Sequence, residues 1–280
     1  MRRLTEFWRR YRRNVLAVLA FGVLLVVAAM AVFADLLYPQ GPWEMVTRPF
    51  LWPGDRSQHL LGSDMLGRDV MAGIVHGSRV SLLIGVVATA VAFIIGTLVG
   101  ATAGYFRGWV DDVLMRFTEV FQTIPPFMFL IVLVAIFKPS VTTITLAIGI
   151  VSWPTLARLV RSEFLTLRER DFVQAGFVIG MSNTRIILTQ ILPNALPPVI
   201  VTSSVIVATA IINESALSFL GLGDPNLMSW GTMIGAGRQV LRNAWYLTAL
   251  PGIAILLTVL ALNIAGDGLN DALNPRLKSG

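Results

Sequence analysis

Six long stretches without a charged residue constrain the fold of this chain more than any other feature. A helix that crosses the hydrocarbon core of a membrane needs about 20 mostly apolar residues. Only 14% of the residues are charged, against roughly 25% in an ordinary globular chain. The sequence therefore predicts an all-α membrane protein with six spans, and it excludes a soluble domain and a secreted disulfide scaffold. The stretches cover residues 14–34, 80–106, 120–137, 139–157, 186–213 and 243–266.

These stretches predict a single transmembrane domain over residues 1–280. We expect long connections at 35–79 and 220–246 outside and at 160–194 inside, and long connections in compact proteins are usually functional. The first stretch follows several arginines, as in a signal peptide. Its apolar run of 19 residues from Val15 to Phe33 exceeds the usual length of about 7–15, so we expect an uncleaved span. The expected spans are about 14–34, 81–104, 117–137, 141–159, 195–219 and 247–266.

Basic residues predict the orientation, because cytoplasmic connections of membrane proteins are enriched in Lys and Arg. With the N-terminus in the cytoplasm, fifteen basic residues fall inside and seven outside. The sequence therefore predicts that both termini are cytoplasmic. This placement also accounts for the net charge of +6 without a nucleic-acid partner. The fifteen are Arg2, Arg3, Arg9, Arg10, Arg12, Arg13, Arg107, Arg116, Arg158, Arg161, Arg168, Arg170, Arg185, Arg276 and Lys278.

Metal and thiol chemistry are not expected in this chain. It has no Cys, and a thiolate site or a disulfide needs one. His59 and His76 are too few and too isolated for a metal cluster. Both also belong to the outer segment, which argues against an intramembrane hydrolase.

The inner connection 160–194 contains signals for the start and end of helices. Asp171 is suited to cap a first helix, Gly180 to end it in a left-handed conformation, and Ser182 to cap a second one. Pro193 is expected to close the segment before the fifth span. The small residues Ala175, Gly176 and Gly180 would let another surface approach closely. The alternative is a connector that only packs against the bundle.

Residues 170–176 (RDFVQAG), Gly180 and residues 191–194 (ILPN) resemble the EAA loop of bacterial ABC importer permeases. The family pattern reads E-A-A, three residues, G, nine residues, I-x-L-P. The spacing is kept, while Gln174, Gly176 and Gln190 replace the Glu, the second Ala and the Ile.

Four further segments resemble the C-type permease subunit of dipeptide, oligopeptide and nickel importers. Together with the loop they extend the resemblance over about residues 5–278, in order and without a large gap. The segments are residues 59–70, 217–223, 229–233 and 266–275.

The resemblance implies a type I importer permease in the bacterial inner membrane. It implies four partner chains besides membrane lipid: a second permease, two cytoplasmic ATPase subunits and an external substrate-binding protein. Dipeptides, longer peptides, nickel chelates and glutathione are all substrates of such relatives. The loop would be the coupling helix, with Asp171, Gln174, Ala175, Gly176, Gly180 and Arg185 at the ATPase contact and with Leu192, Pro193 and Asn194 leading back to the fifth span.

This chain is not expected to be an enzyme. It has no Gly-x-x-x-x-Gly-Lys-Ser/Thr loop to hold phosphates, so ATP and Mg²⁺ would be bound by the partner ATPases. The alternatives are a stand-alone carrier or channel and an intramembrane enzyme or sensor. A carrier usually shows internal repeats, and none is evident here.

Four residues are candidates for the translocation pathway: Glu119, Pro125, Pro126 and Glu214. Two prolines within a span free backbone carbonyls, which need a wet or buried environment. A carboxylate at membrane depth is a functional candidate by default. The open alternatives are a kink that only shapes packing, a Glu119 that pairs with Arg116 at the membrane surface, and a structural Glu214 bound to Asn213 or a helix end.

Two helical patterns complete the expectations. Gly96, Gly100 and Gly104 recur every four residues and predict close helix packing, either slidable or static. Residues 64–79 predict a short amphipathic helix on the outer membrane surface, with Asp64 paired to Arg68 one turn later.

Overall fold

The structure is a computed structural model that describes residues 8–9 and 11–273. All regular elements within these residues are helical, apart from two isolated β-bridges in the segment between the first spans. The elements are α2 (Val15–Val32), α3 (Ala34–Leu37), α4 (Val70–Phe106), α5 (Gly108–Thr123), α6 (Pro126–Phe137), α7 (Val141–Arg168), α8 (Asp171–Val178), α9 (Asn183–Ile186), the π-helical turn η1 (Ile187–Ile191), α10 (Leu192–Phe219), α11 (Trp230–Gly237), the 3₁₀ turn η2 (Arg238–Val240) and α12 (Tyr246–Leu273).

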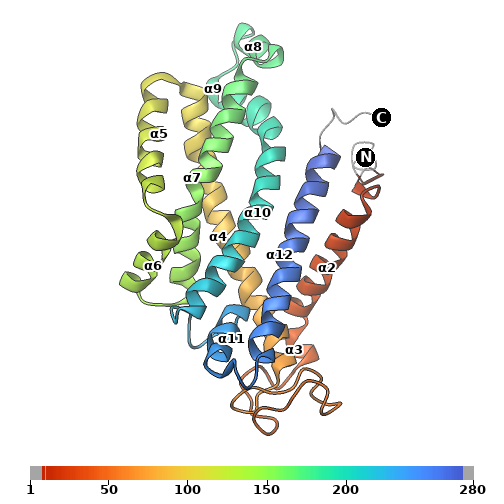
Figure 1. The fold of residues 1–280 in the computed structure, drawn as a ribbon. Helices are drawn as coiled ribbons and strands as arrows, with labels where there is room; N and C mark the ends of the chain where they lie inside the picture. Colours follow the sequence, from red (N-terminus) through yellow and green to blue (C-terminus); the bar gives the residue numbers. More distant parts are fainter. Residues whose placement is uncertain (1–7, 10, 274–280) are drawn as a thin grey trace.

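Among the described residues, five of the six predicted spans coincide with single helices, and the remaining stretch is a bent pair of helices. Helices α2, α4, α7 and α12 and the continuous run from α9 to α10 are each long and apolar enough to cross a membrane. Helices α5 and α6 cover the third predicted span, pass the same test only as a pair and bend by 81° at their junction; we call this pair the broken span. Figure 1 shows the spans as one elongated bundle.

The break in the third span follows from Pro125 and Pro126. The residue before a proline is pushed out of the helical region, and Ile124 accordingly has an extended backbone with φ −90° and ψ 129°. Pro126 starts α6 at its first position, where the missing N–H costs nothing. The kink expected from these two prolines is therefore a complete interruption of the helix.

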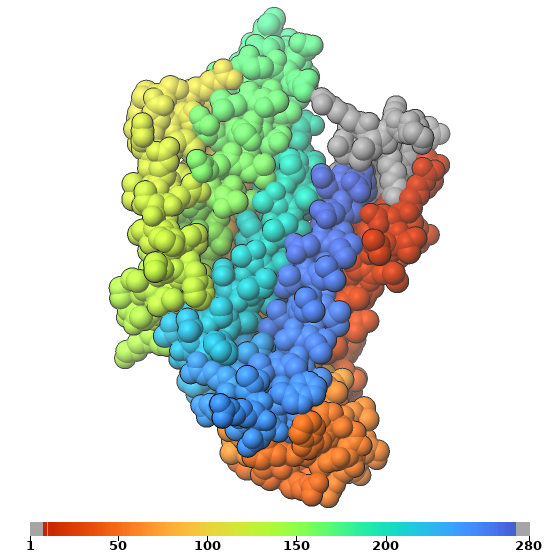
Figure 2. All heavy atoms as spheres, in the orientation of Figure 1, coloured from red at the N-terminus to blue at the C-terminus, as the bar shows by residue number. Residues whose placement is uncertain are grey.

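Helix α8 marks one end of the bundle, and α11 with residues 38–69 marks the other (Figures 1 and 2). The start of α2 and the end of α12 lie at the same end as α8. This arrangement is the one that an even number of spans requires. Among the basic residues that predict the orientation, Arg2, Arg3, Arg10, Arg276 and Lys278 lie outside the described residues.

The expected inner connection 160–194 is mostly helix, which corrects the predicted boundaries. Helix α7 continues to Arg168, and the run α9–η1–α10 begins at Asn183, so only residues 169–182 connect the two spans. Charged residues end an apolar stretch, but they do not end a helix, because its backbone hydrogen bonds continue in water.

The predicted separate helix over residues 64–79 is wrong for a related reason. Helix α4 begins at Val70 and runs unbroken into the span. Residues 64–69 form a turn before it. The apolar spacing that predicted a surface helix belongs to the first turns of α4, whose Val70 and Ile74 are buried.

The core of the bundle is the contact between α4 and α7, which run in the same direction. A Cβ atom on Gly96 would lie 2.7 Å from Cβ of Leu156, and one on Gly104 would lie 2.7 Å from Cβ of Phe164. Gly100 faces Val160 in the same way. The close packing expected from the glycine spacing is confirmed, and we call this contact the glycine seam.

Helix α2 is peripheral by comparison. It packs against α12 and α4, and only 11% of its apolar window is buried within this chain. Its remaining apolar surface lies open on one side of the molecule (Figure 2). Such a surface requires lipid or another membrane chain to cover it.

The glycine seam predicts that one added methyl group lowers the stability of the folded protein. A Cβ at position 100 would meet Val160 Cβ at 2.8 Å and the backbone nitrogen of Arg161 at 3.0 Å, and a backbone atom cannot rotate away. We expect Gly100→Ala to destabilise the purified protein by about 1–3 kcal/mol through overpacking, measured as a lower thermal unfolding midpoint.

Gly252→Ala in α12 is the matched control. Nothing lies within 4 Å of a Cβ there, and Ala favours helix by up to about 1 kcal/mol over Gly, so its midpoint should stay or rise. Equal midpoints for Gly100→Ala and the unmodified protein would show that the seam tolerates a methyl group.

Candidate functional site

Helix α8 starts one residue earlier than the capping pattern predicts. Arg170 occupies the N-cap position, and its carbonyl accepts hydrogen bonds from the backbone N–H groups of Val173 and Gln174. Asp171 is thus the first helical residue rather than the cap, and no side chain caps this helix. Its carboxylate still lies in the first turn, where the helix dipole favours negative charge.

The end of α8 depends on Gly180, as the sequence predicts. Gly180 has φ +77°, a conformation that a residue with a Cβ adopts only at a cost. The N–H of Met181 donates to the carbonyl of Gly176 at 3.0 Å, and that of Gly180 donates to Phe177 at 3.1 Å. This pattern closes the helix and reverses the chain. Ser182 is the N-cap of α9, although its side chain makes no capping hydrogen bond.

One face of α8 packs inward and the other is exposed. Val173 and Gly176 are buried, and a Cβ on Gly176 would lie 3.4 Å from Sδ of Met181 and 3.7 Å from Cγ1 of Ile186. The small residue at 176 therefore packs α8 on its own loop and is not open to another surface, contrary to our expectation.

The exposed face of α8 is apolar at its tip. Phe172, Val178 and Ile179 are 43%, 87% and 75% exposed. The predicted residues Asp171, Gln174, Ala175, Gly180 and Arg185 are exposed as well. The family pattern did not single out Val178 and Ile179. Their signal in the sequence was an apolar pair placed directly before the Gly of a turn.

Tyr105 at the end of α4 ties the loop to the bundle. Its hydroxyl donates to Oδ1 of Asn183 at 2.8 Å, and its ring stacks on Phe177 with centroids 6.5 Å apart. The guanidinium of Arg168 lies 5.4 Å above the same ring. The side chain of Gln174 donates to the carbonyl of Arg168 at 2.9 Å. These contacts connect α8 with α4, α7 and α9.

Leu192, Pro193 and Asn194 form the first turn of α10, which continues from η1 without a break. We expected Pro193 to close the segment before the span. The chain instead widens to a π-helical turn just before the proline, where the N–H of Leu192 bonds to the carbonyl of Ile187. Asn194 donates from its side chain to the carbonyl of Gln190 at 2.6 Å. Such π-turns accommodate the break that a proline makes in the series of backbone hydrogen bonds along a helix.

Glu119, Pro125 and Pro126 are all exposed on the broken span. Glu119 pairs with Arg116, with 3.2 Å between Oε2 and Nη1. The structure therefore places these three pathway candidates on one membrane element, the α5–α6 pair, and it places Glu214 elsewhere.

Glu214 is 2% exposed and enclosed by serine hydroxyls. Its Oε1 accepts hydrogen bonds from Ser229 at 2.6 Å and from Ser218 at 2.9 Å, while Ser215 approaches Oε2 at 3.4 Å. Asn213 is not a partner, but one of the three serines, Ser229, lies at a helix end, as one of our alternatives expected. Because Ser229 is the N-cap of α11, the carboxylate joins α10 to the start of α11.

The start of α11 is also fixed to α4. The backbone N–H of Trp230 donates to Oγ of Ser81 at 3.1 Å, and its indole N–H donates to the carbonyl of Ile74 at 2.9 Å. Trp230 itself is fully buried. Helix α11 is therefore a rigid part of the end opposite α8.

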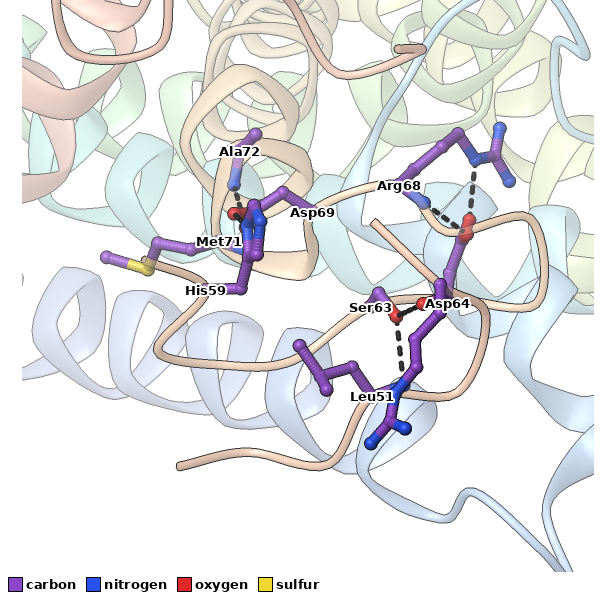
Figure 3. Close-up of polar contacts among 9 residues, drawn as sticks. Leu51, His59, Ser63, Asp64, Arg68, Asp69, Met71 and Ala72 are labelled. Carbon is purple, nitrogen blue, oxygen red and sulfur yellow. Dashed lines mark hydrogen bonds and ion pairs between the residues drawn. The ribbon is translucent and has the colours of Figure 1, made fainter. Parts of the chain in front are cut away.

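Asp69 holds the segment before α4 to the first turn of that helix (Figure 3). Its Oδ1 accepts hydrogen bonds from the backbone N–H groups of Met71 at 2.7 Å and Ala72 at 3.2 Å. Its Oδ2 lies 2.6 Å from Nδ1 of His59. One carboxylate thus caps the helix and binds a residue ten positions earlier.

The predicted pair of Asp64 and Arg68 is present, but in a turn instead of a helix. Arg68 Nε lies 2.5 Å from Oδ2 of Asp64, whose Oδ1 accepts from the N–H group of Arg68 (Figure 3). The same Oδ1 accepts from the N–H group of Leu66. A short carboxylate side chain that bonds the backbone two residues later favours a turn over a helix.

Two family comparisons decide what this helical bundle is. Residues 96–279 match the family of binding-protein-dependent transport system inner membrane components, and residues 3–59 match the N-terminal transmembrane domain of oligopeptide transport permease C. The chain belongs to the ABC importer permeases. It is therefore a multi-pass protein of the inner membrane, and its relatives are transport subunits, not enzymes.

Curated relatives match almost the whole permease. The di/tripeptide transport system permease protein of Pseudomonas aeruginosa is 37% identical over 99% of this chain and 93% of its own length. The dipeptide permease protein of Escherichia coli is 40% identical, covering 98% and 94%. The glutathione permease protein of Pectobacterium atrosepticum is 38% identical, covering 98% and 91%.

A solved structure has the same permease fold. A chain of the MetNI methionine ABC transporter, in an inward-facing conformation, superimposes with a TM-score of 0.62 over 73% of this chain and 98% of its own. At 18% identity this likeness shows the fold alone. The predicted type I importer permease fold is confirmed.

The three serine hydroxyls around Glu214, which we call the serine cradle, predict that two substitutions of Glu214 differ in thermal stability. Glu214→Ala leaves buried hydroxyls without their acceptor, which costs about 1–3 kcal/mol, so its thermal midpoint should fall clearly below that of Glu214→Gln, whose amide oxygen still accepts. Glu119→Ala, an exposed change expected to stay within about 0.5 kcal/mol, is the control. Indistinguishable midpoints for the Ala and Gln variants at position 214 would contradict the cradle.

Proposed function

We propose that this permease forms half of the translocation pathway of an ATP-driven importer of short peptides. The observation that carries the proposal is the exposed helix α8, which projects from the end of the bundle and is tied to three spans. A connector that served only packing would turn its apolar residues inward, and Val178 and Ile179 are turned outward.

Helix α8 would seat in a groove on a partner ATPase. Its apolar tip, formed by Phe172, Val178 and Ile179, provides the surface that such a contact buries. Motion of α8 would pass to α7 through the short connection at 169–170, and to α10 through α9 and η1. A short rigid lever on packed helices suits a switch between two discrete arrangements.

The end that carries α8 would face the cytoplasm. The basic residues at this end include Arg107, Arg168, Arg170 and Arg185, as expected for the cytoplasmic side. The opposite end, with α11 and residues 38–69, would then receive substrate from an external binding protein. A second related permease would complete the pathway, and the ATPase partners would hold ATP and Mg²⁺.

The substrate class rests on the relatives. Two of them are named for dipeptides or tripeptides and one for glutathione, and the latter is itself a tripeptide derivative. Short peptides are therefore the proposed cargo of this chain. In this scheme Glu214 anchors α11 at the outer end, and Glu119, Pro125 and Pro126 line the pathway from the broken span.

Single cysteines test the contact, because the chain contains none. A cysteine in place of Val178 should form a disulfide cross-link with a cysteine scanned along the surface of the partner ATPase. A cysteine in place of Gly176, whose side chain would point inward, and one in place of Leu60 in the segment at the other end of the bundle are the controls. The proposal fails if Val178→Cys cross-links no more than these two.

Uptake by proteoliposomes separates the importer from a stand-alone carrier. We expect labelled Ala-Ala to accumulate only when the second permease, both ATPases, the binding protein and ATP are present. Accumulation with this chain alone would establish the carrier instead.

A further inference from the structure

A polar pocket of about 280 Å³ lies between α5 and α7, in the half of the bundle nearer α8. We call it the α5–α7 pocket. All but one of its lining residues are charged, although it adjoins two membrane spans. The lining residues are Asp112, Met115, Arg116, Glu119, Arg158 and Arg161.

Two of the three arginines in the pocket already have carboxylate partners. Arg161 donates to both oxygens of Asp111, at 2.5 and 2.6 Å, and this pair ties α7 to α5. Arg116 pairs with Glu119 at 3.2 Å. These pairs neutralise four of the charges at the pocket.

Arg158 and Asp112 remain without an ion pair among the described residues. The guanidinium of Arg158 is held by a neutral group, since Nη1 donates to Oε1 of Gln122 at 2.6 Å. Asp112 is exposed and makes no ion pair within the described part of the chain. Asp112 also attracts Arg161 electrostatically. The pocket thus offers one guanidinium on α7 and one carboxylate on α5 that form no ion pair among the described residues.

The balance of charge determines the class of ligand. With Asp111 behind it, the pocket combines three guanidinium groups and three carboxylates, so a purely anionic or cationic ligand gains no net attraction. A zwitterion whose two charges are separated can satisfy both free groups at once. A guanidinium matches a carboxylate with two parallel hydrogen bonds, and a carboxylate accepts hydrogen bonds from an ammonium group.

We propose that the α5–α7 pocket binds the two charged ends of a short, unblocked peptide on its way through the permease. Arg158 receives the terminal carboxylate and Asp112 the terminal ammonium. The proposal rests on the peptide importer proposed above and names the residues that hold its cargo. A site that binds only the two charged ends of a peptide accepts peptides with any side chains. This suits a pathway for peptides of many sequences.

The location gives the site a means of release. Gln122, which holds Arg158, lies in the last turn of α5, directly before the 81° break. A change in the angle between α5 and α6 would move Gln122 relative to α7 and release the guanidinium from its orientation. Binding at this pocket is therefore sensitive to the conformation of the broken span.

Equilibrium binding to the complete transporter tests the proposal. The transporter, without its binding protein, is placed in phosphatidylglycerol nanodiscs and titrated with radiolabelled Ala-Ala. We expect saturable binding that N-acetyl-Ala-Ala-amide, which lacks both charges, does not displace. Arg158→Gln and Asp112→Asn should each weaken binding by about tenfold or more, since a hydrogen bond to a charged group contributes about 1.5–3 kcal/mol.

Three controls separate the site from general damage. Arg158→Lys keeps the charge and should retain part of the affinity. Arg242→Gln, an exposed arginine at the other end of the bundle, should bind as the unmodified protein does. The thermal midpoints of the variants report whether they are folded. Equal affinity in Arg158→Gln, Asp112→Asn and the unmodified transporter overturns the proposal, as does the absence of saturable binding.

A zwitterionic lipid headgroup has the same two charges and is the other source of this chemistry. Native mass spectrometry in mixed phosphatidylethanolamine and phosphatidylglycerol membranes distinguishes the two. The proposal is overturned, and the pocket assigned to lipid, if two results are found together. The unmodified protein retains phosphatidylethanolamine that Ala-Ala does not displace, and Arg158→Gln abolishes this retention.

Uptake in proteoliposomes shows which of the two ideas has failed. If the unmodified complex takes up no Ala-Ala, the proposed importer function fails. If it takes up Ala-Ala and both variants transport at the same rate, the function stands and the pocket proposal alone is overturned.

Discussion

The close contact of α4 with α7 is the constraint on which the rest of this permease depends. Glycines at 96, 100 and 104 bring the two helices together along their halves nearer α8 (Figure 1), where a methyl group would meet backbone atoms. Helices held so closely cannot separate without opening a void, so we expect them to move as one body. Their ends, Tyr105 with Arg107 and Arg168 with Glu169, therefore form a fixed base for α8.

Polar contacts between helices also fix the positions of elements within the bundle. The pair of Arg161 with Asp111 joins α7 to α5, and Glu214 joins α10 to α11 through Ser229. A polar group in such an environment is costly unless it is fully hydrogen-bonded. Each of these carboxylates accepts at least one hydrogen bond from a neighbouring helix or its cap, so each fixes the position of one element on another.

The sequence predicted the spans and the turn at Gly180 because both follow from local chemistry. Uncharged stretches mark the membrane, and a glycine at a helix end marks a left-handed residue. It could not predict how far α7 and α10 continue into water, since a helix that leaves the membrane keeps its hydrogen bonds while its side chains become polar. It also mistook the first turns of α4 for a separate helix, because the apolar spacing is identical in both cases.

The candidate site was only partly visible for a different reason. The spacing of the family pattern located α8. The direction of each side chain, however, depends on how the helix is rotated about its axis against Met181 and Ile186. That packing turns Gly176 inward and Val178 outward. The pocket that Arg158 and Asp112 line was likewise hidden, because the two residues lie 46 positions apart and reach one pocket only through the packing of α5 on α7.

The central claim is that α8 passes the motion of an ATPase to the bundle. The most direct measurement is a cryo-electron microscopy structure of the complete transporter, determined with and without a trapped nucleotide. The account predicts that Val178 and Ile179 are enclosed by the ATPase in both states, and that α4, α7 and α8 shift together between them. A structure in which α8 lies free in solvent, or moves while α4 and α7 separate along the glycine seam, would contradict it.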